Sequence, residues 1–220
     1  MDKLALPCLA LVTDLQLFGS SQLMLKRVSS AIDAGVNMVQ LREKNLPGAP
    51  LLELAKKLRA LTQGKALFVV NERVDVAVSC KADGVQIGEN GLPISVVKSI
   101  MGSQALCGRS VHDVKGAMQA CNQGADFLVL GAMFPTESHP EEPVFGLSLM
   151  GLIRKQVDVP ILGIGGISVS NAAEVITAGA DGIAVIRSIL LADDPAKVTR
   201  DLAASISHEL VAKKVLKGLM

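Results

Sequence analysis

The chain has 220 residues, of which 50% are apolar, and its formal net charge is +1. The near-neutral charge argues against a nucleic-acid partner, because nucleic-acid-binding domains usually carry a strongly basic face. No apolar segment reaches the roughly 18 residues of a membrane helix, so no membrane association is expected. No linker composition divides the chain, which predicts one domain over residues 1–220. The four widely spaced cysteines favour free thiols in a reducing, cytoplasmic compartment.

Four segments share one pattern, in which a helix-like stretch is followed by a small residue or glycine and then by a short apolar run. They are "AIDAGVNMVQLRE" from Ala31, "CKADGVQIGEN" from Cys80, "CNQGADFLVLGAMF" from Cys121 and "ITAGADGIAVIRS" from Ile176. Glycine suits the left-handed end of a helix, and a continuous apolar run suits a strand buried on both faces. The repeated unit is therefore a helix, a short turn and a parallel strand.

Further strand-like runs alternate with these segments. They are "LALVTD" near the start, "ALFVVN" from Ala66, "ALCGRSV" from Ala105 and "PILGIGG" from Pro160. Eight strands alternating with helices predict an α/β fold, a single (β/α)8 TIM barrel. A doubly wound open sheet is the alternative, but its phosphate-binding glycines should follow the first strand, where "TDLQLFG" does not supply them.

Polar side chains follow the second strand in the stretch "QLREK". Gln40, Arg42 and Lys44 alternate there, so they project to one side of an extended chain. Two cations at this spacing suit a phosphate or pyrophosphate, which Arg binds in bidentate fashion. The competing interpretation is a solvated strand end in which Glu43 is the ion-pair partner.

The third and fifth strands also end in polar residues. Asn71 and Glu72 carry oxygen ligands that suit Mg2+, although Asn71 is equally suited to capping the helix "VDVAVSC". Ser110 could donate a hydrogen bond to a substrate or cap the helix that begins at Asp113. The sequence leaves both pairs of alternatives open.

The longest irregular loop, "GAMFPTESHPEEPVFG", follows the sixth strand. Long loops in compact domains often bind ligands, which makes Thr136, Ser138 and His139 candidate contacts. His139 has the pKa range for proton transfer, but a lone loop histidine is more often solvated or structural.

Adjacent glycines, Gly165 and Gly166, follow the seventh strand in "PILGIGGISVSN". In barrels of this class, the loops after the seventh and eighth strands commonly bind phosphate. Bare glycines let main-chain N–H groups approach an anion closely. The sequence therefore predicts a phosphate site made by "GIGGIS" and by "IRS" after the eighth strand.

Taken together and in this order, seven motifs resemble those of thiamin phosphate synthase and its relative, the TenI-type thiazole tautomerase. They are "QLREK", "N-x-RVDVA", "ADGVQIG", "GRSVH", "GAMFPT", "GIGGI" and "AGADGIAVI", and they cover nearly the whole chain. The resemblance implies a barrel enzyme that joins hydroxymethylpyrimidine pyrophosphate to thiazole phosphate. Pyrophosphate departs, and the thiazole nitrogen attacks the pyrimidine-stabilised carbocation that remains. Mg2+ and cationic side chains stabilise the departing charge.

The same resemblance implies roles for single residues at the pyrophosphate end. Gln40, Arg42, Lys44 and Ser110 would hold the pyrophosphate, while Asn71 would bind the pyrimidine side or the leaving group. By the same resemblance, Glu72 and Glu89 would be the metal ligands. No partner beyond these small phosphates is implied, and a homo-oligomer stays open.

The thiazole end takes its implied residues from the last three loops. Thr136 and Ser138 would contact the thiazole phosphate, and His139 would join the catalytic groups. Gly166, next to Gly165, would cradle that phosphate. The main chain of Ile186 and Arg187 would complete the cradle.

The chain departs from the synthase pattern at three charged positions. Glu72 stands in place of an Asp, Gly91 in place of the Asp of "GQED", and His139 in place of a loop Lys. If a weakened magnesium site limits the rate, Gly91→Asp should raise activity. The tautomerase remains an alternative, although Ala132 stands where its catalytic His is found, and a non-catalytic thiazole or thiamin phosphate binder is a third.

Overall fold

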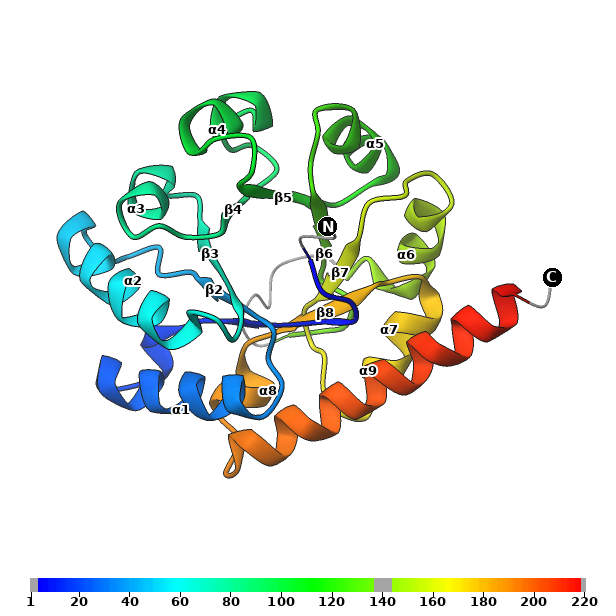
Figure 1. The fold of residues 1–220 in the computed structure, drawn as a ribbon. Coiled ribbons are helices and arrows are strands. Elements are labelled where there is room, and N and C mark those ends of the chain that lie inside the picture. The colour runs from blue at the N-terminus through cyan, green and yellow to red at the C-terminus, as the bar shows by residue number, and fades with distance from the viewer. Residues whose placement is uncertain (1–3, 137–143, 219–220) are drawn as a thin grey trace.

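The computed structural model describes residues 4–136 and 144–218, with side chains as far as residue 211. Parallel strands form a closed barrel in the order β1 to β8 (Figure 1). The predicted (β/α)8 barrel is therefore confirmed, and the doubly wound open sheet is wrong. The strands are β1 Cys8–Val12, β2 Met38–Leu41, β3 Leu67–Asn71, β4 Gly84–Ile87, β5 Leu106–Val111, β6 Phe127–Leu130, β7 Ile161–Ile164 and β8 Gly182–Val185.

Helices surround the ring of strands, and the long last helix runs along the outside of the barrel (Figure 1). None of the helices in the described part of the chain is long and apolar enough to cross a membrane. The helical elements are η1 Leu15–Leu17, α1 Ser21–Asp33, α2 Gly48–Thr62, α3 Val74–Ser79, α4 Ile94–Met101, α5 Val114–Asn122, α6 Gly146–Arg154, α7 Ala172–Ala178, α8 Arg187–Leu190 and α9 Pro195–Gly218.

The fourfold sequence pattern corresponds to a repeated hydrogen bond at the amino-terminal end of the barrel. Before each even-numbered strand, an Asn or Asp side chain accepts the main-chain N–H of a residue at or next to the start of the preceding strand. The pairs are Asn37 with Leu9 (2.9 Å), Asp83 with Phe68 (2.7 Å), Asp126 with Cys107 (2.8 Å) and Asp181 with Ile161 (3.0 Å). This end of the barrel therefore serves stability and leaves the opposite end for chemistry.

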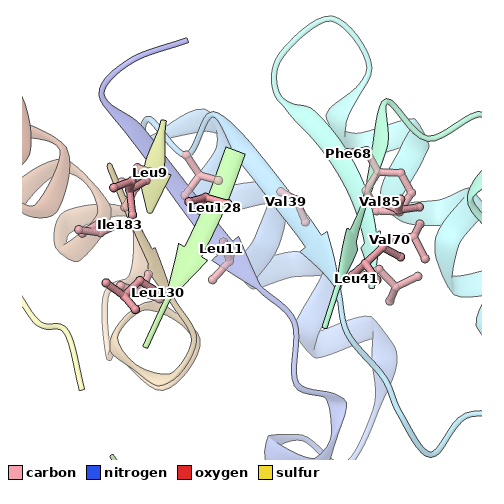
Figure 2. Close-up of a cluster of buried hydrophobic side chains, with 14 of the residues drawn as sticks. Leu9, Leu11, Val39, Leu41, Phe68, Val70, Val85, Leu128, Leu130 and Ile183 are labelled. Atoms are coloured by element: carbon pink, nitrogen blue, oxygen red, sulfur yellow. The ribbon is translucent and has the colours of Figure 1, made fainter. Parts of the chain in front are cut away.

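Alternation along the strands separates two hydrophobic clusters. The outer cluster lies between the strands and the helices and includes Leu9, Val39 and Phe68, part of which Figure 2 shows. The inner cluster fills the barrel and includes Met38, Leu106 and Phe127. Because successive side chains of a strand point to opposite faces, strands covered on both faces are apolar throughout. The barrel is packed rather than hollow, and its free space lies where the strands end.

Candidate active site

A cavity of about 430 Å³ opens at the carboxyl ends of the strands. Every sequence-predicted site residue within the described part of the chain lines it, whereas Ser138 and His139 lie outside the described residues. The predicted residues that line it are Gln40, Arg42, Lys44, Asn71, Glu72, Glu89, Ser110, Thr136, Gly165, Gly166, Ile186 and Arg187. These residues lie in or after seven of the strands, β2 to β8, and thus meet at one place.

The basic stretch after β2 is braced from behind by Glu43. The Oε1 atom of Glu43 accepts a hydrogen bond from the Thr13 hydroxyl at 2.7 Å and another from the Leu15 N–H at 3.0 Å. Thr13 in turn accepts the N–H of Arg42 at 3.0 Å. Burial raises the pKa of Glu43, and the hydrogen bonds from Thr13 and Leu15 oppose that rise. Glu43 thus ties the segment that carries Arg42 to the end of β1.

Two amide hydrogen bonds form a polar floor across β2 to β5. Gln40 donates through Nε2 to Asn71 Oδ1 at 3.1 Å, and Gln86 donates through Nε2 to Ser110 Oγ at 3.0 Å. Asn71 does not cap α3, which begins without a side-chain cap, and α5 is capped by Asp113 rather than by Ser110. The capping alternatives for Asn71 and Ser110 are therefore wrong.

Gln86 is a residue of the floor that sequence reasoning missed. It is 3% exposed, and its Oε1 is a buried atom without a hydrogen-bond partner in the structure. A side chain at Gly108 would collide with that oxygen, so the glycine leaves the space that the amide occupies. A buried acceptor without a partner is costly and uncommon, so the amide gains stability if its side chain turns to meet a donor. The sequence signal that could have identified Gln86 is its position as a polar residue inside the apolar run "GVQI".

The acidic side of the cavity carries Glu72 and Glu89. Glu72 Oε1 accepts the N–H of Gly88 at 2.6 Å, while Glu89 Oε2 lies 2.8 Å from Nδ1 of His112. His112 also contacts the Phe145 ring, with 5.3 Å between the ring centroids. No three His, Cys, Asp or Glu side chains among the described residues form a set that could hold a metal ion. Mg2+ commonly binds through one or two carboxylates plus substrate phosphates, and this donor set fits that mode.

The glycine pair after β7 has a packing role as well as a place in the cavity. Gly165 and Gly166 have φ values of 97° and 64°, which favour glycine. A Cβ on Gly165 would lie 2.7 Å from that of Ala132, and one on Gly166 would lie 2.8 Å from that of Phe134. The glycines therefore let the loop after β6 approach closely, which was not part of the sequence prediction. Asn171 holds the loop by donating to the Gly166 carbonyl at 3.0 Å.

The start of α8 adjoins this loop. The Ser188 hydroxyl donates to the carbonyl of Ile167, which fixes α8 against the loop after β7. Ile186 and Arg187 line the cavity immediately before Ser188. The predicted pairing of "GIGGIS" with "IRS" is thus spatially correct.

Comparisons with known proteins agree with this geometry. The family model described as thiamine monophosphate synthase matches residues 9–189. A thiamine-phosphate synthase of Haloarcula marismortui is 46% identical over 82% of this chain and 88% of its own. One from Laribacter hongkongensis is 42% identical over 90% and 94%. A solved thiamine phosphate pyrophosphorylase of Pyrococcus furiosus superposes with a TM-score of 0.84 at 38% identity, covering 95% of this chain and 98% of its own.

The motifs, the barrel and these relatives lead to the same assignment. The chain belongs to the thiamine monophosphate synthase family and is a transferase of the thiamin phosphate synthase type.

Proposed function

We propose that the cavity joins hydroxymethylpyrimidine pyrophosphate to thiazole phosphate and releases pyrophosphate. The observation that carries this proposal is that two different regions suited to anions lie around one cavity. One region has the cations Arg42 and Lys44 after β2, and the other has the glycine loop after β7 with the start of α8. In the closed barrel, β1 and β8 separate β2 from β7. Two phosphorylated substrates can therefore be held apart while their reacting ends meet between them.

At the first region, Arg42 and Lys44 bind the pyrophosphate, together with the hydroxyl of Ser110. As the bond to the leaving group breaks, negative charge grows on the pyrophosphate oxygens. Fixed cations stabilise that charge in the transition state without having to reorganise. Glu43 supports this role because its hydrogen bonds to Thr13 and Leu15 hold the segment in place.

The polar floor binds the pyrimidine between the two regions. Its exocyclic amine is a hydrogen-bond donor, and we assign the Gln86 amide as its acceptor, the buried and unpartnered Oε1 being brought to the amine by a turn of the side chain. The neighbouring Gln40–Asn71 pair orients the ring from the adjacent strands. A buried site that hydrogen-bonds a substrate discriminates strongly against analogues that lack the matching group.

At the second region, the thiazole phosphate binds to the main chain of Gly166, Ile186 and Arg187. Thr136, on the segment that packs against the glycine loop, lines the same part of the cavity. Asn171 and Ser188 stiffen this region through their hydrogen bonds to neighbouring carbonyls. Holding the phosphate there directs the ring nitrogen toward the pyrimidine carbon, which is catalysis by positioning.

Glu72 and Glu89 are the residues that would hold Mg2+, as part of a metal–pyrophosphate complex. When bound, the ion neutralises charge on the leaving group. Two carboxylates are the protein contribution that suits Mg2+ when it binds together with a phosphorylated substrate.

The tautomerase alternative lacks its catalytic side chain. Ala132, at the position of the tautomerase histidine, is 4% exposed and packs on Gly165. Its methyl group lines the cavity but cannot transfer a proton. We therefore favour the synthase reaction.

The test is to incubate the protein with both phosphorylated substrates and Mg2+ and to measure the products. Thiamin phosphate and pyrophosphate should form in equal amounts. Omission of either substrate should abolish both products. Turnover of the thiazole tautomer without Mg2+ and without thiamin phosphate would contradict the proposal. We also propose a cytoplasmic location, which the free thiols of all four cysteines support.

A further inference from the structure

A short turn after β4 encloses the carboxylate of Glu72. The N–H of Gly91 donates to the carbonyl of Gly88 at 3.0 Å, which closes the turn, and Gly88 donates its own N–H to Glu72 Oε1 at 2.6 Å. A Cβ on Gly88 would lie 2.7 Å from Oε1, and one on Gly91 would lie 2.8 Å from Oε2. The carboxylate therefore occupies the space that side chains at both positions would take.

The main chain of Glu72 is held in an unusual conformation. Its φ is 62°, in the left-handed region that residues other than glycine adopt rarely. Its N–H donates to the carbonyl of Gln86 at 2.9 Å, and its carbonyl accepts the N–H of Val74 at 3.0 Å. Such conformations persist where the surrounding structure holds them, and they cluster at functional sites.

Arg109 fixes the turn from its other side. Its side chain is on β5 and the residue is only 6% exposed. It donates to the carbonyls of Gly88 at 2.6 Å and Leu92 at 2.7 Å. The turn is thus anchored to β5 at both its ends, so it forms a rigid seat for the Glu72 carboxylate.

We propose that Gly88 and Gly91 are positioning residues, which place the Glu72 carboxylate for the metal–pyrophosphate complex by leaving it room. The proposal rests on the proposed function and deepens it. It joins two departures from the synthase pattern, since the longer acid at 72 fills the space left by the missing side chain at 91. The expectation that Gly91→Asp raises activity is opposed by the structure, because the new side chain would collide with Ile87 and with Glu72.

A double-mutant cycle between Gly88→Ala and Glu72→Ala tests the seat by thermal unfolding. Within 4 Å, a methyl on Gly88 would meet only Oε1 and Cδ of Glu72. Gly88→Ala should therefore lower the Tm by several degrees in the wild type and have almost no effect in the Glu72→Ala background. Gly19→Ala is the matched control, because its methyl would meet no atom within 4 Å and should act equally in both backgrounds. Equal effects of Gly88→Ala in both backgrounds would overturn the proposal.

The functional half is measured by calorimetry with inorganic pyrophosphate at increasing Mg2+, which does not depend on turnover. Gly88→Ala should raise the Mg2+ concentration needed for half-maximal binding by about 10- to 100-fold, the usual cost of losing support for a metal ligand. Glu72→Asp should also raise this Mg2+ concentration, because its shorter side chain retreats from Gly88. This variant replaces Gly88→Ala in the experiment if Gly88→Ala folds poorly. Unchanged Mg2+ dependence in both variants would refute the positioning role.

The two proposals fail in different ways. If the wild type makes no thiamin phosphate but the cycle is coupled and the Mg2+ dependence shifts, the synthase proposal fails and the seat stands. If the wild type is an active synthase but the cycle is additive, only the seat fails. An active Gly91→Asp variant with unchanged stability would also count against the seat.

Discussion

Gln86→Met should separate stability from substrate binding. The variant keeps the length of the unbranched side chain while removing the buried Oε1 that lacks a partner. Removing an unsatisfied buried acceptor recovers about 1–3 kcal/mol, and losing the hydrogen bond to Ser110 costs about 1 kcal/mol. The free energy of unfolding should therefore rise by zero to about 2 kcal/mol, with about 2–4 °C in Tm for each kcal/mol at this chain length.

Substrate binding should change in the opposite direction. If Oε1 of Gln86 accepts the pyrimidine amine, KM for the pyrimidine pyrophosphate should rise about tenfold, the equivalent of about 1.4 kcal/mol. KM for thiazole phosphate should stay nearly constant. Urea or thermal unfolding and steady-state kinetics measure the two effects on the same preparation.

Gln40→Met is the matched control for this prediction. Its amide is already paired with Asn71, so the variant loses a hydrogen bond and relieves no unsatisfied atom. It should be destabilised by about 1 kcal/mol. If Gln86→Met were as destabilised as Gln40→Met, or if it bound the pyrimidine substrate normally, the role assigned to the buried oxygen would be refuted.

Three other predictions concern charged and ionisable groups. Arg42→Ala should weaken pyrophosphate binding, measured by calorimetry, about 10- to 100-fold, the equivalent of about 1.5–3 kcal/mol. Binding of thiazole phosphate should stay nearly intact, and an equal loss of both would contradict the assignment. Burial raises the pKa of Glu43 in the folded state above its value in the unfolded chain. Between these two pKa values the folded protein binds the proton more tightly, so the free energy of unfolding falls as pH rises through that range. Glu43→Gln should remove this pH dependence when unfolding free energies are measured at a series of pH values. An unchanged slope would argue against a raised pKa of Glu43. Burial raises the pKa of Cys8 to about 12 and of Cys107 to about 11, so both thiols should react with a thiol reagent only after unfolding; rapid labelling of the native protein would disprove this.

Much of the site could be predicted from the sequence because strand order and side-chain alternation are local properties. Once eight strand-like runs alternate with helices, the closed barrel brings all their carboxyl ends to one mouth. Residues at the carboxyl ends of the strands, such as Arg42, Asn71 and Ser110, are then expected to line it, and they do. The glycines after the seventh strand were located in the same way.

The choice of partners was decided only by the tertiary structure. Asn71 could cap a helix or face the cavity, and its pairing with Gln40 on the neighbouring strand settled the question. The seat of Glu72 on Gly88 joins residues 16 positions apart in the chain, and no periodicity specifies such a contact. Sequence pattern determines which face and which end of a strand a residue occupies. The curvature of the closed sheet and the packing of its loops determine which atoms it meets there.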